Sequence, residues 1–301
     1  MQITKMHGLG NDYVFINGFD QPVEDPSSVA PAIADRHFGV GGDGLILLLP
    51  PDDGVDAHIQ MRMFNADGSE AEMCGNGVRC LCKLAYDRDV CREKPMRVQT
   101  GAGVLTLNYR LSDNDRVEEV SVDMGAPILT ADEIPVANIP ADENGRVIDA
   151  PLGGAVEFSA HGPKGWTDAA GLDPRMTCVS MGNPHAIFFC DDTDAVPLEH
   201  IGPVLEHASI FPNRINVHFV SVDGPEELTM ATWERGSGIT LACGTGASAV
   251  CVAGVLTGRA ERRVLAHLPG GDLRLHWDES TDHVEMTGPA TEVFTGTWPV
   301  G

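Results

Sequence analysis

The chain has 301 residues, 43% of them hydrophobic, and its 44 acidic side chains against 20 Lys and Arg give a formal charge of −24. This length corresponds to about two ordinary domains, and the negative charge argues against nucleic acid or an anionic membrane as a partner. The longest apolar run near the start, YVFI at 13–16, is too short for a secretory signal or a membrane span, so we expect a soluble cytoplasmic protein.

The first half of the chain predicts strands, one early helix and one helix that follows a cysteine. Gly10-Asn11 opens the strand-like YVFI run, and residues 26–37 predict a helix. After Cys74, apolar residues recur at helical spacing: Val78, Leu81, Cys82 and Ala85. Two strand-like segments follow, VQTGAGVLTLNYR at 98–110 and RVEEVSVDMG at 116–125.

The second half begins with a segment, 125–175, that is rich in Pro, Gly and Asp, where we expect the domain crossover and surface loops. Residues 197–208 predict a helix. After Cys243 the sequence GTGASAVCVAGVLTGR is small and apolar throughout, which predicts a helix that is buried on all sides and ends at Gly258. Strand-like segments are NRINVHFVSV (213–222), LTMATWE (228–234) and DLRLHWDE (272–279).

Cys74 and Cys243 are each followed by Gly-x-Gly, as CGNG (74–77) and CGTG (243–246). These two cysteine motifs belong to a longer internal repeat. Ten residues before each cysteine an aromatic residue precedes a polar one, as Phe64-Asn65 and Trp233-Glu234. Further upstream, Gly10-Asn11 and Gly182-Asn183 each precede an apolar strand. This duplication predicts an α+β fold of two similar lobes, each a mostly antiparallel sheet around one buried helix.

A thiol at a helix start suggests acid–base chemistry. The free N–H groups and the macrodipole there stabilise a thiolate and lower the thiol pKa from about 8.5, and the glycines leave N–H groups open to a bound carboxylate. Two such thiols suit proton exchange at one carbon from opposite faces. A pyridoxal enzyme would need a lysine. None of the four lysines lies in a cysteine motif, which favours racemisation without a cofactor, although the lysine count alone does not exclude pyridoxal.

The same residues also have structural interpretations. A cysteine before a glycine can simply pack, Asn11 and Asn183 can be turn residues, His185 can be a core histidine, and Arg235 can pair with a surface carboxylate. We interpret the other six cysteines as structural, because no signal peptide predicts disulfides and no spacing predicts zinc: Cys80, Cys82, Cys91, Cys178, Cys190 and Cys251.

The chain resembles the diaminopimelate epimerases nearly from end to end. The resemblance rests on six blocks: MHGLGNDYVFIN (6–17), RHFGVGGDGL (36–45), FNADGSEAEMCGNGVRC (64–80), SMGNPHAIFF (180–189), NRINVHFV (213–220) and WERGSGITLACGTGASA (233–249). It implies two similar lobes, each a mostly antiparallel barrel-like sheet around a central helix, with the active site in the cleft between them. We expect residues 1–124, joined by the C-terminal segment 290–301, and residues 125–289 to form these lobes.

The resemblance also implies an activity: the epimerisation of LL-diaminopimelate to meso-diaminopimelate, by a homodimer, without metal or other cofactor. Cys74 and Cys243 match the two catalytic bases, and His185 and Glu234 match positions that tune the thiol pKa values. The positions that match substrate-binding residues are Asn11, Asn65, Gly75, Asn76, Asn183, Asn216, Glu234, Arg235, Gly244 and Thr245.

Two positions depart from the family pattern. Gly44 stands where some members carry a glutamine that contacts substrate, and Ile239 stands where a glutamate is common. One alternative is a proline or hydroxyproline racemase of related fold, although those enzymes typically show a CGHG-like first motif. The other is a binding or thiol-redox protein, for which a C-x-x-C pair would be expected.

Overall fold

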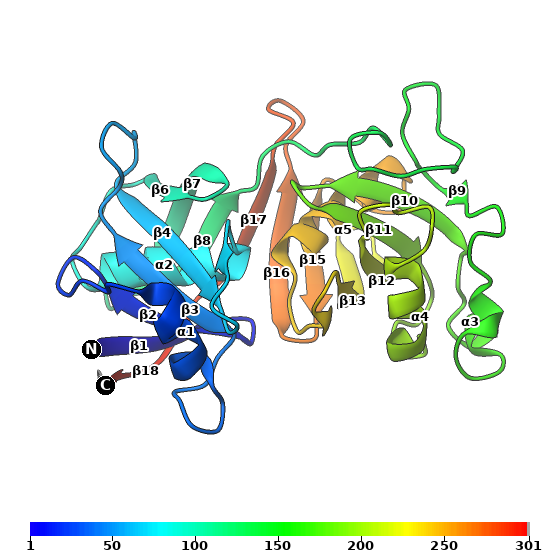
Figure 1. The fold of residues 1–301 in the computed structure, drawn as a ribbon. Helices are drawn as coiled ribbons and strands as arrows, with labels where there is room; N and C mark the ends of the chain where they lie inside the picture. The colour runs from blue at the N-terminus through cyan, green and yellow to red at the C-terminus, as the bar shows by residue number, and fades with distance from the viewer. Residues whose placement is uncertain (300–301) are drawn as a thin grey trace. The chain divides into compact units, whose positions relative to one another are not determined.

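The computed structural model describes residues 1–299 and divides into two compact units (Figure 1). The N-terminal unit comprises Met1–Asp123 and the chain from Thr287 onward, and the C-terminal unit comprises Met124–Met286. Of the segment 290–301 that was expected to join the first lobe, residues 300 and 301 lie outside the described residues. Within residues 1–299, no helix is long and apolar enough to cross a membrane.

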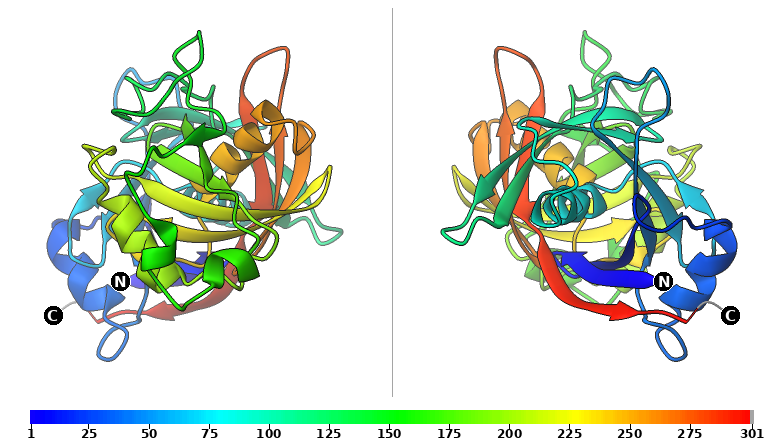
Figure 2. Two further views of the ribbon diagram at one scale, coloured as in Figure 1. Left: turned by 90° about the vertical axis from the view of Figure 1, so that its right-hand side faces the viewer. Right: turned by 90° about the vertical axis from the view of Figure 1, so that its left-hand side faces the viewer.

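In the N-terminal unit a sheet curves around the helix α2 (Gly75–Asp87), as the right-hand view of Figure 2 shows. Hydrogen bonding runs in the order β18, β1, β2, β3, β4, β6, β7, β8. The strands nearest the two ends of the chain, β1 and β18, pair antiparallel, and just beyond them the Met1 ammonium donates to the Trp298 carbonyl at 2.6 Å. The strands are β1 (Gln2–Gly8), β2 (Asn11–Asn17), β3 (Gly44–Leu49), β4 (Ile59–Asn65), β5 (Glu70–Ala71), β6 (Met96–Thr100), β7 (Gly103–Leu111), β8 (Val117–Asp123) and β18 (Thr291–Thr297).

The C-terminal unit repeats this plan around the helix α5 (Gly244–Leu256). Its strands follow the order β9, β10, β11, β12, β13, β15, β16. They are β9 (Ala150–Pro151), β10 (Arg175–Ser180), β11 (Pro184–Phe189), β12 (Asn216–Gly224), β13 (Glu227–Glu234), β14 (Gly238–Ile239), β15 (Arg263–Leu268) and β16 (Gly271–Trp277); β17 (Val284–Pro289) contains the boundary between the units.

The pairing pattern confirms the predicted duplication. From β1 to β7 successive pairs are antiparallel, parallel, antiparallel, parallel and antiparallel. From β10 to β16 the same five relations occur in the same order. The predicted α+β class, with a mostly antiparallel sheet around one helix in each lobe, is therefore correct.

Burial explains the sequence of the strands. β3, with the sequence GLILLL, is apolar throughout because α1 packs on it as well as α2. β15 and β16 instead alternate buried and more exposed residues, as expected for strands that are covered on one face.

The two outer helices lie where the sequence predicted them but are shorter. α1 spans Pro26–Ala34 and α4 spans Leu198–Glu206. α1 ends because the Asp35 carboxylate accepts from the backbone N–H groups of His37 and Phe38. The segment 125–175, where the crossover and surface loops were expected, also contains short helices and core residues that the sequence did not predict. This segment contains a 3-10 turn (η1, Phe158–Ala160) and α3 (Trp166–Ala169), and it contributes Ile134, Val147, Phe158 and Trp166 to the core of the C-terminal unit.

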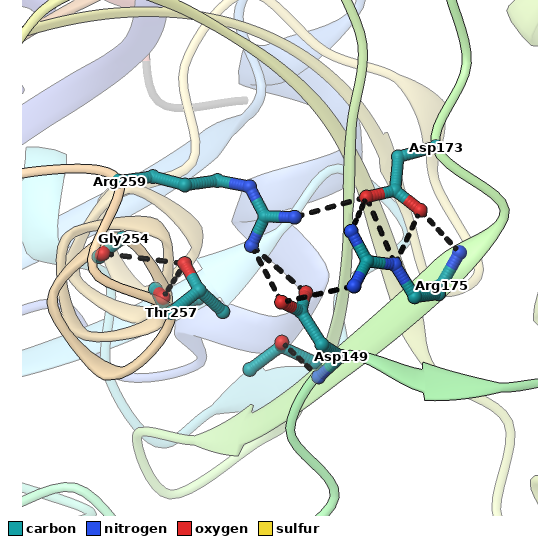
Figure 3. A network of polar contacts seen from close by, with 8 residues as sticks. Asp149, Asp173, Arg175, Gly254, Thr257 and Arg259 are labelled. Atoms are coloured by element: carbon teal, nitrogen blue, oxygen red, sulfur yellow. Dashed lines mark hydrogen bonds and ion pairs between the residues drawn. The ribbon is translucent and has the colours of Figure 1, made fainter.

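A charged network anchors the C-terminal end of α5 (Figure 3). The Arg259 guanidinium donates to both oxygens of Asp149, at 2.8 and 2.9 Å, and to Asp173 at 2.9 Å. Arg175 binds the same Asp173 carboxylate. Thr257 donates back to the helix carbonyls of Ala253 and Gly254. The far end of the helix that begins after Cys243 is thereby tied to β10 and the loop before it.

Candidate active site

Each of the two central helices begins immediately after one of the motif cysteines. Cys74 is the N-cap residue of α2 and Cys243 that of α5, and both have extended backbone conformations. Gly75 and Gly244 are the first helical residues, and both are buried. The sequence-based placement of both thiols at helix starts agrees with this geometry.

Around Cys74 the polar contacts come from Asn11 and from α2. The thiol accepts from the Gly77 backbone N–H at 3.4 Å and donates to the Asn11 side-chain oxygen, Oδ1, at 3.3 Å. Asn76 also donates to Asn11 Oδ1, at 3.3 Å. Asn11, Cys74 and Asn76, which were predicted to belong to one site, therefore lie together.

The orientation of Asn11 is set by a carboxylate that the sequence analysis did not single out. Asn11 Nδ2 donates to Asp43 Oδ2 at 2.6 Å, and because a carboxylate can only accept, Oδ1 is the atom that faces Cys74. Asp43 is held in turn by Arg36 at 2.9 Å. Asp43 stands in the block RHFGVGGDGL, so a requirement for an acceptor beside Asn11 could have drawn attention to it.

A buried arginine supports the first turn of α2. Arg79 is fully buried and donates to the Gly75 carbonyl at 3.1 Å and to Asn76 Oδ1 at 2.8 Å. These bonds direct the Asn76 amide nitrogen toward Asn11. Asn65, by contrast, donates to the Ser69 hydroxyl at 3.0 Å, within its own turn.

Cys243 has a different environment, and here the expected lowering of a thiol pKa by a helix start is wrong. Burial raises the pKa of the Cys243 thiol well above its ordinary value, and the Glu234 carboxylate, by charge and by hydrogen bonding, raises it further. Thr245 and the Gly246 backbone N–H lower it by less. Cys243 is 4% exposed, so loss of hydration of the thiolate outweighs the effect of the helix terminus on its pKa.

Glu234 and Arg235 follow one another at the end of β13 but make different contacts. The Thr240 hydroxyl donates to Glu234 Oε1 at 2.5 Å. The Arg235 backbone N–H donates to Asn216 Oδ1 at 2.9 Å, while its exposed guanidinium donates to the Asn213 carbonyl at 3.2 Å. Asn216 also donates to the Pro184 carbonyl at 2.8 Å, so its amide is fixed by backbone on both sides.

Asn183 connects Cys243 to two buried histidines. Its amide nitrogen donates to Thr245 Oγ1 at 3.3 Å, and Thr245 Oγ1 lies 3.6 Å from Cys243 Sγ. Its oxygen lies 3.0 Å from His185 Nε2, and His185 Nδ1 lies 2.9 Å from His218 Nε2. His218 was not predicted, although it stands inside the block NRINVHFV.

The two departures from the family pattern lie in well-defined positions. A Cβ atom built on Gly44 would overlap the Phe64 carbonyl oxygen, so this backbone excludes any side chain there. Ile239 is half exposed and pairs with Trp233 in the short strand β14.

Comparisons with known proteins agree with these motifs. The sequence model described as diaminopimelate epimerase matches residues 3–130 and 177–293. The diaminopimelate epimerase of Acetivibrio thermocellus is 47% identical over 296 residues, covering 98% of both chains.

Among solved structures, a predicted epimerase from Pseudomonas aeruginosa has a TM-score of 0.68 at 14% identity and covers 100% of this chain and 99% of its own. A probable proline racemase from Agrobacterium radiobacter has a TM-score of 0.63 at 14% identity, with 100% and 93% covered. At such identities the structures share the fold alone.

Proposed function

The chain belongs to the diaminopimelate epimerase family, and from this premise we propose that it interconverts LL- and meso-diaminopimelate by proton exchange at the α-carbon. One cysteine thiolate removes the α-proton while the other thiol donates a proton to the opposite face, which inverts the centre. The observation that carries the proposal is the pair of cysteines, Cys74 and Cys243, each at the start of a central helix in one half of a duplicated fold.

The helix starts provide for the charge that develops during the reaction. Removal of the α-proton places enolate character on the neighbouring carboxylate. The first-turn backbone N–H groups of Gly75, Asn76, Gly244 and Thr245 suit that anion, because they point out of a helix N-terminus, where the macrodipole is positive. We assign these four residues to the reacting carboxylate.

The remaining predicted residues are assigned to the other ends of the substrate. Glu234 suits an ammonium group and Arg235 a distal carboxylate, which a long diamino diacid has and proline lacks. Asn11, Asn65, Asn183 and Asn216 bind polar groups without adding net charge. The exposed position of Arg235 supports its assignment to the distal carboxylate. The effect of the Glu234 carboxylate on the pKa of Cys243 supports a second role for Glu234, in tuning that thiol.

We propose that the reaction uses no pyridoxal cofactor. Three of the four lysines have defined partners that would compete with a Schiff base: Lys5 pairs with Asp12 at 2.6 Å, Lys83 with Asp87 at 2.9 Å, and Lys94 lies over the Tyr109 ring. Borohydride treatment, which reduces a pyridoxal imine, should leave activity unchanged. The purified protein should also lack the absorbance band of a pyridoxal imine.

We also propose a homodimer in the cytoplasm. Exposed apolar side chains support an interface between subunits: Phe38, Val293 and Phe294 are 91%, 54% and 46% exposed. All eight cysteines, which lie within residues 1–299, are free thiols, as suits a reducing compartment. Light scattering should give twice the chain mass of 32.1 kDa, and Phe294→Glu should shift it toward the monomer if β18 contributes to the interface.

The decisive experiment is a substrate comparison. LL-diaminopimelate and meso-diaminopimelate should each be converted to the same mixture, followed by chiral chromatography. L-proline and trans-4-hydroxyproline, under the same conditions, should remain unchanged. In D₂O, early product should carry deuterium at the inverted centre while unreacted substrate does not. Turnover of proline, or deuterium in recovered substrate, would contradict the assignment.

A further inference from the structure

The C-terminal unit contains a continuous hydrogen-bonded chain that leads to Cys243. It begins on β13, crosses β12 and β11 and ends at the start of α5. Each successive pair of polar atoms is 2.9 to 3.6 Å apart. The residues, in order, are Thr232, His218, His185, Asn183, Thr245 and Cys243.

The direction of each bond in the chain follows from its neighbours. Because Asn183 Nδ2 donates to Thr245, the Asn183 oxygen faces His185 Nε2, which must donate. Burial lowers the pKa of His185 well below its ordinary value, so the ring is neutral and its Nδ1 accepts from His218 Nε2. Burial lowers the pKa of His218 to about 3, so its Nδ1 accepts in turn from the Thr232 hydroxyl.

The same logic defines what reaches the sulfur. Thr245 Oγ1 already accepts from Asn183, so its hydrogen is directed elsewhere, and Cys243 Sγ lies 3.6 Å away. A hydroxyl that donates to sulfur stabilises the thiolate relative to the thiol. This opposes the effects of burial and of the Glu234 carboxylate on Cys243. The charge of Arg235 adds to the effect of burial in lowering the pKa of His185.

The N-terminal unit shows that packing alone does not require a histidine at 218. In register, Tyr13 pairs with Gly44 as His185 pairs with Asn216, so Ile46 occupies the position that corresponds to His218. A Cβ atom built on Gly77 would overlap Ile46, and one built on Gly246 would overlap His218. The same place beneath the helix start is filled by an aliphatic side chain in one unit and by an imidazole in the other.

We propose that His218 is a positioning residue for Cys243: it fixes the tautomer of His185 and, through Asn183, directs the Thr245 hydroxyl to the sulfur. This inference deepens the proposed function and rests on it only where activity is measured. Through its hydrogen bonds His218 acts on the sulfur by way of His185, Asn183 and Thr245, and in the proposed reaction it does not contact the substrate. Its contribution is to hold the direction of the chain.

The test compares two substitutions at the same position. His218→Ile installs the residue of the twin unit and removes the donor to His185, whereas His218→Gln keeps an amide N–H near the Nε2 position. Iodoacetamide alkylation of Cys243 is followed by peptide mass spectrometry from pH 7 to 9.5. His218→Ile should slow it about tenfold, the factor expected for one lost hydrogen bond to a charged group. His218→Gln should recover most of the rate.

Two other cysteines and one control variant separate a change at Cys243 from general unfolding. Cys74 reports the twin helix start, and its rate should stay within about twofold, since every residue of the hydrogen-bonded chain belongs to the C-terminal unit and Cys74 to the N-terminal one. Cys178, fully buried in β10 of the same unit, reports local opening. Ile46→Val, at the twin position, should leave Cys243 unchanged. Nitrogen-15 spectra of the imidazoles should show His185 protonated at Nε2 in the wild type and a tautomer mixture in His218→Ile.

Activity adds a further reading. With diaminopimelate, His218→Ile should lower kcat with little change in KM. The pH above which kcat rises, as the Cys243 thiolate forms, should move to a higher value. Equal slowing of Cys243 by Ile and Gln, or no slowing by Ile in a folded protein, would overturn the inference. If His218→Ile does not fold, the isosteric Thr232→Val, which removes the donor to His218, should shift Cys243 in the same direction by less. A wild type that does not act on diaminopimelate but shows these alkylation shifts would refute the proposed function alone.

Discussion

The starts of α2 and α5 have the same backbone arrangement, but different hydrogen-bonding groups face the two sulfurs: an acceptor at Cys74 and a hydroxyl that can donate at Cys243. In the N-terminal unit, Asp43 binds the Asn11 amide nitrogen, so an oxygen faces Cys74 and accepts from it. In the C-terminal unit, His185 binds the Asn183 oxygen, so the amide nitrogen faces Thr245, whose hydroxyl can donate to Cys243. Asn11 and Asn183 occupy equivalent positions, but the acceptor Asp43 and the donor His185 turn their side-chain amides in opposite directions.

This difference shows what the duplication preserved and what it did not. Both units have the same strand order, a cysteine at the start of the central helix, and an aromatic residue ten positions before that cysteine. The orientation of the asparagine beside each cysteine instead depends on side chains outside the cysteine motifs, Asp43 for Asn11 and His185 for Asn183. A two-base reaction needs one base and one acid in each direction, and unequal surroundings are one way to separate them.

Removal of either thiol tests whether both units contribute. Cys74→Ala and Cys243→Ala should each lower epimerisation by about 10²–10⁴-fold, the usual contribution of a general acid or base. Conversion of LL- to meso-diaminopimelate by chiral chromatography measures it. Cys82→Ala, in α2 but away from the helix start, is the matched control and should keep activity. Normal turnover by either motif variant would mean that one unit is dispensable.

Neutralising Glu234 should lower the pKa of the Cys243 thiol. Its carboxylate raises the pKa of Cys243, so Glu234→Gln should move the alkylation profile of Cys243 to lower pH and leave that of Cys74 in place. Activity should fall at the same time, because Glu234 is also assigned to the substrate. An unshifted Cys243 profile would remove Glu234 from the environment of the thiol.

Acid should destabilise the C-terminal unit through its histidines. The unfolded chain takes up protons on His185 and His218 below about pH 6.5, whereas the folded chain does not until far lower pH, about 3 for His218. Stability is therefore complete above pH 6.5 and falls as pH falls, by about 1.4 kcal/mol per pH unit for each histidine. Urea unfolding at pH 7 and 5 should show a loss about 2 kcal/mol smaller in His218→Ile than in wild type.

The arginines at the C-terminal ends of α5 and α2 should contribute unequally to the free energy of unfolding, and this is the smallest difference predicted between the two units. Arg259 binds two carboxylates after α5, whereas Arg88 at the end of α2 binds Glu292 alone, at 2.8 and 2.9 Å. Both arginines are partly exposed, so we expect Arg259→Met to cost about 1–2 kcal/mol and Arg88→Met under about 1 kcal/mol. Denaturant midpoints measure both, and an equal cost would show that the second carboxylate adds nothing.

The sequence predicted those features that depend on local pattern. The helix after Cys74 follows from Val78, Leu81 and their helical spacing, and the helix after Cys243 from its unbroken run of small apolar residues. The duplication was visible because Phe64 and Trp233 stand at the same distance before the two cysteines.

What was missed depends on contacts between distant segments. The pKa of Cys243 is governed by burial and by Glu234, neither of which the helix start reveals. Asp43 and His218 act through strand register, which brings them beneath Asn11 and Gly246 from elsewhere in the chain. The buried residues of 125–175 were missed because Phe158 and Trp166 are isolated among turn-forming residues and join the core only in three dimensions.

The pairing of β1 with β18 has a consequence for biosynthesis. The ribosome makes Met1–Asp123 first, but this segment lacks the strand that covers β1 until Thr291–Thr297 emerges. The C-terminal unit is continuous in the chain and can complete its sheet earlier. During synthesis the N-terminal domain usually folds first. Here that order is reversed, because the unit that is translated first cannot complete its sheet until β18 has been made.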